Sequence, residues 1–143
     1  MTESPGLVDT NILCYAFDKK DKRKQITASK LLSRCWQSEI SLAVSVQNLA
    51  EFSVVMTEKV ENPVNHELIT RFIRDISLFQ GWKVLYYNPE SVIDAVQLSS
   101  KYSLHFWDSL LVATMKLNGL ELIYSEDSHF KKVPWLTVIN PLI

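Results

Sequence analysis

Short apolar runs alternate with longer amphipathic segments along almost the whole chain, and this alternation limits the available folds more than any other feature. Strands are predicted at residues 6–8, 40–44, 83–86, 121–124 and 136–139. Helices are predicted at residues 24–36, 46–59, 66–79, 89–102 and 107–117. Strands that are separated by helices need crossover connections, so the pattern indicates an α/β fold with a parallel sheet and helices on both faces.

The breaks between the predicted elements fall at residues that suit them. Ser45 is a good N-cap for the helix over 46–59, and Asn62-Pro63 follows it. Asn118-Gly119 is a natural C-terminal stop for the helix over 107–117. No repeat, low-complexity segment or linker interrupts the 143 residues, which predicts one domain over 1–143.

The charge balance does not indicate a nucleic-acid-binding protein. Lys and Arg total 15 and Asp and Glu total 16, so the net charge is −1, whereas nucleic-acid binders are often basic. Any surface that binds a polyanion must therefore be a local basic patch. The run over residues 18–24 offers one place, and its candidates for phosphate contacts are Lys20, Lys22, Arg23 and Lys24. The alternative for this run is an ordinary solvated start of a helix.

Cysteine content and hydropathy point to a reducing, aqueous compartment. Cys14 and Cys35 lie among apolar neighbours, which favours buried free thiols over a disulfide. Residues 1–6 are polar and lack the apolar core of a signal peptide. No stretch of about 18 apolar residues occurs, so no transmembrane helix is expected. These features predict a cytoplasmic protein with no membrane association.

Four acidic residues fall at the ends of different predicted elements. Asp9 directly follows the first strand, and Asp127 closely follows the fourth. In parallel sheets, functional groups collect beyond the carboxyl ends of the strands, so these two acids belong at one edge. Glu51 lies in the second turn of the helix after the second strand, and Asp108 opens the apolar helix that reaches Leu117.

Converging carboxylates repel one another, and a divalent cation removes the conflict. Oxygen-only ligands select a hard ion such as Mg²⁺ or Mn²⁺. Such an ion also binds phosphate oxygens and activates water, which is the chemistry of phosphodiester hydrolysis. The four acids therefore predict a metal-dependent nuclease site.

Each acid also has an ordinary structural alternative. Asp9 could be a turn or N-cap residue, and Glu51 could be a partly exposed helix residue. Asp108 could cap its helix, and Asp127 could cap a short turn through His129 and Phe130. Only the joint placement of the four acids favours a site.

Four segments resemble motifs of the PIN-domain family, and most closely those of its VapC-type toxins. They are residues 8–11 around Asp9, residues 45–52 around Glu51, residues 106–114 around Asp108, and residues 125–127 ending at Asp127. They occur in the family's order, and the resemblance extends from residue 7 to residue 140. Ser125 stands where Thr is common, and Glu126 is an added acid that leaves the fourth ligand open between Glu126 and Asp127.

The resemblance implies a three-layer α/β/α fold with a central parallel sheet of about five strands. It implies an endoribonuclease that holds Mg²⁺ or Mn²⁺, with Asp9, Glu51, Asp108 and Asp127 as catalytic residues. It further implies that Thr10, Asn11 and Ser125 orient the carboxylates or water, as Glu126 could. The partners would be an RNA substrate and a small antitoxin of a type II toxin–antitoxin system. A homodimer is left open, since the apolar helix over 66–79 could serve a dimer as well as a core.

Other function classes find no support in the sequence. There is no G-x-G-x-x-G loop, Walker loop or G-x-S-x-G elbow. Two alternatives within the same fold stay open. The chain could be a PIN nuclease of RNA processing without an antitoxin, or a non-catalytic RNA-binding module of that fold.

Overall fold

A single parallel sheet of five strands forms the centre of the computed structural model, which describes residues 4–143. The strands lie in the order β3-β2-β1-β4-β5, and every neighbouring pair is parallel. Their bounds are Gly6–Val8 (β1), Leu42–Ser45 (β2), Trp82–Leu85 (β3), Leu122–Tyr124 (β4) and Thr137–Ile139 (β5). The predicted fold class and strand number are confirmed, with the second strand starting two residues later than expected. Residues 1–3 of the polar N-terminal segment lie outside the described residues.

Six α-helices and two shorter helical segments connect the strands. The α-helices are α1 (Thr10–Phe17), α2 (Lys22–Trp36), α3 (Val46–Val54), α4 (His66–Leu78), α5 (Pro89–Tyr102) and α6 (Phe106–Leu117). The shorter segments are a π-helical turn, η1 (Val55–Lys59), and a 3₁₀ turn, η2 (Ser128–Lys132). None of the helices within residues 4–143 is long and apolar enough to cross a bilayer.

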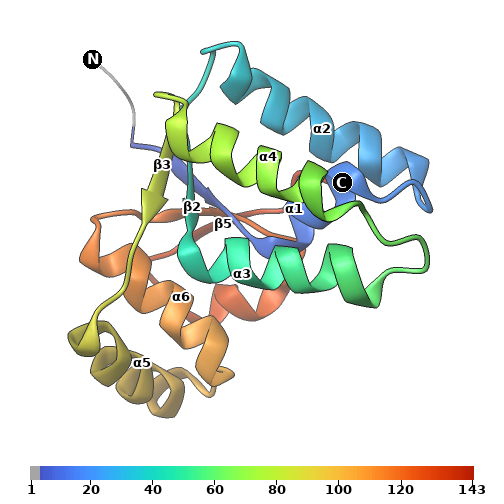
Figure 1. Cartoon of the computed structure of the whole chain (residues 1–143). Coiled ribbons are helices and arrows are strands. Elements are labelled where there is room, and N and C mark those ends of the chain that lie inside the picture. Colours follow the sequence, from blue (N-terminus) through green and yellow to red (C-terminus); the bar gives the residue numbers. More distant parts are fainter. Residues whose placement is uncertain (1–3) are drawn as a thin grey trace.

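The helices cover the sheet from both sides and give the expected three layers (Figure 1). Helices α2 and α4 lie on one side of the sheet, and α5 and α6 lie on the other. Neighbouring strand residues face opposite layers, as the pleat requires. Val8 and Val44 pack into the core under α2 and α4, whereas Leu7 and Ala43 pack into the core under α5 and α6.

The starts of helices α1 and α6 differ from the sequence prediction. Helix α1 was not expected, and it begins immediately after β1 because the Asp9 side chain caps it by accepting from the Thr10 amide. Helix α6 begins at Phe106 with His105 at its N-cap position. Asp108 therefore lies within the first turn and does not cap the helix.

The carboxyl ends of β1, β2 and β4 meet at one edge of the sheet. The register pairs Val8 with Tyr124, and the Asp9 amide donates to the Tyr124 carbonyl at 3.0 Å. The residues that follow β1 and β4 are thus neighbours. Helix α3 starts at the same edge because it follows β2 directly, with Ser45 as its N-cap. This edge carries the candidate site.

Candidate active site

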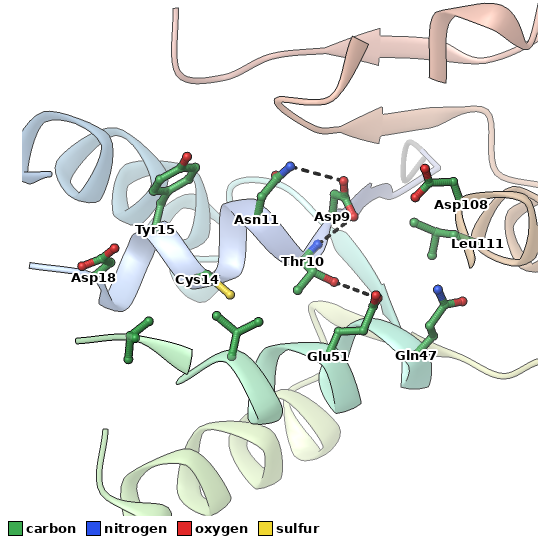
Figure 2. A pocket seen from close by; sticks show the side chains of 12 residues that line it. Asp9, Thr10, Asn11, Cys14, Tyr15, Asp18, Gln47, Glu51, Asp108 and Leu111 are labelled. Carbon is green, nitrogen blue, oxygen red and sulfur yellow. Dashed lines mark hydrogen bonds between the residues drawn. The ribbon is translucent and has the colours of Figure 1, made fainter. Parts of the chain in front are cut away.

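A pocket of about 410 Å³ opens at the carboxyl edge of the sheet, and three of the four predicted acids line it. Asp9 comes from the start of α1, Glu51 from α3 and Asp108 from the first turn of α6. Figure 2 shows the side chains of these residues directed toward a common space, with Gln47 and Leu111 beside them. Segments far apart in the sequence therefore bring three carboxylates together.

Asp9 is the most buried of these acids in its carboxyl group and has the most hydrogen bonds. Its Oδ1 accepts from the Thr10 amide at 2.8 Å, and its Oδ2 accepts from the Ser125 hydroxyl at 2.7 Å. Burial raises the pKa of Asp9 from 3.8 to about 6, against the lowering effect of the Ser125 and Thr10 hydrogen bonds. The charges of Asp108 and Glu51 raise this pKa further.

Glu51 is held by a chain of polar contacts that starts inside the protein. The buried Asn48 donates to the Thr10 hydroxyl at 2.9 Å, and that hydroxyl donates to Glu51 Oε1 at 3.2 Å. Much of the Glu51 side chain is exposed, yet burial around its carboxyl group raises its pKa, and the charge of Asp108 adds to this rise. The Thr10 hydrogen bond acts in the opposite direction.

Asp108 is placed by the connection between α6 and α3. Gln47, one turn before Glu51, donates from its Nε2 to the Trp107 carbonyl at 2.9 Å. This contact ties the start of α6 to the helix that carries Glu51. Burial raises the pKa of Asp108, and the charge of Asp127 raises it further.

Asp127 and Ser125 lie on the loop after β4, and Asp127 does not line the pocket. Its Oδ1 accepts from the His129 amide at 2.8 Å and lies 2.8 Å from His129 Nδ1, so it caps η2 as its structural alternative predicts. The Ser125 hydroxyl donates to Asp9 and accepts from the Asp127 amide at 2.9 Å. Asp127 thus affects Asp108 through its charge, and its backbone amide is linked to Asp9 through the Ser125 hydroxyl.

Glu126 turns away from the three pocket acids. Its Oε1 accepts from Lys24 at 2.7 Å and its Oε2 accepts from the Tyr15 hydroxyl at 2.7 Å. Hydrogen bonding by Lys24 is the main reason that its pKa is lowered, whereas the pKa values of Asp9, Glu51 and Asp108 are raised. Between the two neighbouring acids, Glu126 is therefore the one that is already paired with a cation.

The chemistry of the pocket fits a hard divalent ion. Every acidic donor is an oxygen, and the acids raise one another's pKa values, which a cation would reverse. Asn11 Oδ1 and Gln47 Oε1 are buried oxygens without hydrogen-bond partners beside these acids. Within residues 4–143 no three Asp, Glu, His or Cys side chains are already spaced to hold an ion. The carboxylates would have to draw together to bind one.

The basic run lies close to the site, but only part of it is free. Arg23 donates to the Leu142 carbonyl at 2.9 Å, and Lys24 is engaged with Glu126. Lys20 forms a long, exposed ion pair with Glu61 at 3.9 Å. Lys22 is exposed at the first position of α2.

Sequence reasoning missed four lining residues that carry polar groups or a thiol, namely Cys14, Tyr15, Asp18 and Gln47. Three of them lie on or at the end of the unexpected helix α1, where Tyr15 follows Asn11 by four residues. Gln47 precedes Glu51 by the same interval on α3. Helical i, i+4 spacing from the known motif residues was the signal that could have found Tyr15 and Gln47. Cys14 is a free thiol, as predicted, and burial raises its pKa to about 12.

Comparison with solved structures gives close matches in fold at low identity. A chain of a toxin–antitoxin complex from Klebsiella pneumoniae is 22% identical, with a TM-score of 0.67 over 95% of this chain and 97% of that chain. VapC20 of Mycobacterium tuberculosis, described as a sarcin-ricin loop cleaving toxin, is 18% identical, with a TM-score of 0.68 over 90% and 94%. DNA-bound VapBC from Salmonella typhimurium is 15% identical, with a TM-score of 0.62 over 96% and 97%.

The sequence itself carries the family assignment. Comparison with curated proteins gives no significant match. The sequence profile described as PIN domain, in contrast, matches residues 6–136. This match includes strands β1 to β4 and ends just before β5, and it includes every acid of the site. The chain therefore belongs to the PIN domain family.

Proposed function

We propose that this protein is a metal-dependent endoribonuclease that hydrolyses RNA phosphodiester bonds at the acid pocket. The observation that carries the proposal is the meeting of Asp9, Glu51 and Asp108 from three separate elements in one pocket with raised pKa values. A repulsive group of this kind destabilises a protein that has no use for it. The same group is the natural holder of a catalytic cation.

Each polar residue around the pocket has a role in this proposal. Asp9, Glu51 and Asp108 hold Mg²⁺ or Mn²⁺, and Asp127 contributes negative charge from the loop after β4. When bound, the ion supplies activation of water and neutralisation of charge on the phosphate. Thr10 and Ser125 keep Glu51 and Asp9 in position by donating hydroxyl hydrogen bonds to them.

RNA is proposed as the substrate because of the relatives that share this fold. One of them is described as a toxin that cleaves the sarcin-ricin loop. The test is to incubate purified protein with RNA and Mg²⁺ or Mn²⁺, with and without chelator. Cleavage that needs the metal, and that is lost in Asp9→Asn, supports the proposal. Absence of cleavage by wild type with either metal, or the same cleavage by wild type and Asp9→Asn, would refute it.

We further propose that the protein is the toxin of a toxin–antitoxin pair in the cytoplasm. Two of the solved relatives come from toxin–antitoxin or VapBC assemblies. A larger cleft of about 860 Å³ adjoins the acid pocket and shares Asp18 and Val60 with it, which offers room for a protein segment. An Arg or Lys from the antitoxin would pair with the pocket carboxylates and displace the metal.

Expression in cells separates this proposal from a nuclease of RNA processing. The chain alone should slow growth, Asp9→Asn should be harmless, and co-expression with an adjacent small gene should restore growth. Equal growth with wild type, variant and empty vector would favour RNA processing without an antitoxin. A non-catalytic RNA-binding module would bind RNA without cutting it under any metal condition.

A further inference from the structure

Three residues at the margin of the acid pocket form a closed polar cluster, which we call the Lys24 latch. It consists of Tyr15 on α1, Lys24 on α2 and Glu126 on the loop after β4. Lys24 Nζ lies 2.7 Å from Glu126 Oε1 and 3.2 Å from the Tyr15 hydroxyl, and 4.7 Å from the centroid of the Tyr15 ring. All three pairs within the cluster are thus in contact.

The latch joins parts of the chain that are far apart in sequence. Glu126 is 111 residues from Tyr15 and 102 residues from Lys24 along the chain. The two residues that flank Glu126 are Ser125, which donates to Asp9, and Asp127, whose charge acts on Asp108. Holding Glu126 against α1 and α2 therefore fixes the short loop from which both neighbours reach the site.

The alternating directions of the loop side chains explain why Glu126 suits this role. Ser125 is buried and directed to Asp9. Glu126, the next residue, is directed away from Asp9 to Tyr15 and Lys24. The Ser125 amide also donates to the Ile139 carbonyl at 2.9 Å, so one side of the loop is held by β5. The latch holds the other side.

We propose that the Lys24 latch is a positioning device that sets the loop 125–127 relative to Asp9, and that Glu126 is not a metal ligand. The expected effect of the latch on metal binding rests on the proposed metal-dependent function. Breaking the latch at either end frees the loop. Lys24→Met and Glu126→Gln should therefore both weaken Mn²⁺ binding, although they change the net charge in opposite directions.

The direction in which each variant changes Mn²⁺ affinity distinguishes the latch from two other roles for Lys24 and Glu126. If the two residues act only through long-range charge, removing Lys24 strengthens cation binding while removing Glu126 weakens it. If Glu126 is itself a ligand, Glu126→Gln abolishes binding while Lys24→Met leaves it intact or tighter. A latch alone predicts the same direction for both changes and no further loss in the double variant.

The experiment is a calorimetric titration of the full chain with Mn²⁺ in the absence of RNA. Each single variant and the double variant should bind about 10-fold more weakly than wild type, at the lower end of the effects seen for groups that orient metal ligands. Lys24→Arg keeps the ion pair and should stay close to wild type. Effects of opposite sign, or losses that add up in the double variant, would overturn the proposal.

The exposed pair of Arg34 and Glu39, 3.5 Å apart, is the matched control. It precedes β2 and so lies toward the opposite edge of the sheet from the site. Arg34→Met and Glu39→Gln repeat the charge changes without touching the loop, and Mn²⁺ binding should not change. An equal loss in this control pair would show that the latch effect is not specific.

Hydrogen exchange of the loop amides provides a readout that needs neither metal nor RNA. The Asp127 and His129 amides are bonded to Ser125 Oγ and Asp127 Oδ1, and their protection should fall in Lys24→Met and Glu126→Gln. Unchanged protection would overturn the latch even if the protein proves to be an RNA nuclease. Conversely, reduced protection supports the latch even if wild type neither binds Mn²⁺ nor cleaves RNA.

Discussion

The acid pocket and the Lys24 latch lie side by side and share Tyr15, yet their charges are balanced in opposite ways. In the pocket, burial and the facing carboxylates raise the pKa values of the acids, with Asp9 at about 6. In the latch, Glu126 faces a lysine and its pKa is lowered. Carboxylates in adjoining parts of the structure thus reach opposite electrostatic states.

The contrast shows which charges depend on something outside the chain. The latch contains its own cation, so it needs nothing further to be stable. The lining of the pocket contains no lysine or arginine among the described residues, and in the proposed function a cation from solution takes that place.

The largest expected effect is on catalysis by the pocket. Asp9→Asn keeps the size of the side chain and its bond from the Thr10 amide, but it removes the negative charge. We expect RNA cleavage in Mg²⁺ to fall by about 1000-fold or more, since a catalytic ion contributes several kcal/mol to the barrier. The measurement is single-turnover cleavage of a labelled RNA. Cleavage near the wild-type rate would show that Asp9 does not hold the ion.

The two regions should also respond to pH in opposite directions. The folded protein keeps a proton on Asp9 up to about pH 6, whereas an ordinary Asp loses it near 3.8. The stability of the metal-free protein should therefore fall as pH rises through this window, by on the order of 3 kcal/mol at most. Asp9→Asn has no carboxyl group to titrate at this position. The stability of the variant relative to wild type should therefore rise between pH 4 and pH 7.

Glu126 supplies the opposite sign because its pKa is lowered in the folded state. Its contribution to stability is present above the ordinary pKa of a glutamate and is lost as pH falls through the folded value. Glu126→Gln should therefore lose stability relative to wild type at pH 7, and this loss should fade toward pH 3. Chemical denaturation in chelator at several pH values measures both trends. Parallel trends in the two variants would remove the contrast between pocket and latch.

A smaller effect is expected where the pocket depends on a neutral hydroxyl. Thr10→Val keeps the shape of the side chain but removes the donor to Glu51 and leaves the Asn48 amide without its acceptor. RNA cleavage should fall about 10-fold, as for other groups that orient a ligand, and Thr10→Ser should restore most of it. Thr27→Val on α2 removes only a bond to the Arg23 carbonyl and serves as the control.

Much of the fold could be predicted because the hydrophobic pattern changes at each element. Helix α5 has the predicted bounds, and Ser45 caps α3 as expected. Helix α1 could not be seen in the same way, because it is short and its cap is Asp9, a residue whose place after β1 suggested catalysis. The end of the helix predicted over 46–59 is a π-helical turn, which a 3.6-residue pattern does not distinguish.

Three of the four predicted acids line the pocket, but the contacts that hold them could not be predicted from the sequence. The parallel-sheet rule places Asp9 and Asp127 at one edge, because it depends only on strand order. Whether Glu126 or Asp127 faces inward depends on the direction of each side chain along a loop, which no periodicity sets. Glu126 is bonded to Tyr15 and Lys24, and their approach to it is a matter of tertiary packing that the sequence does not show.

The smallest expected effect concerns the two neighbouring lysines of the basic run, Lys22 and Lys24. Lys24 is already neutralised by Glu126, whereas within residues 4–143 Lys22 has no ion-pair partner and is exposed. Only a free cation releases counterions when it meets a phosphate. In the Asp9→Asn background, Lys22→Gln should weaken binding of single-stranded RNA about 2- to 3-fold and reduce the salt slope by about 0.7. Lys24→Gln should leave the salt slope unchanged.

The measurement is fluorescence anisotropy at several salt concentrations in chelator. If Lys24→Gln lowers the slope as much as Lys22→Gln does, RNA opens the latch on binding, and the pairing of Lys24 with Glu126 does not persist in the complex.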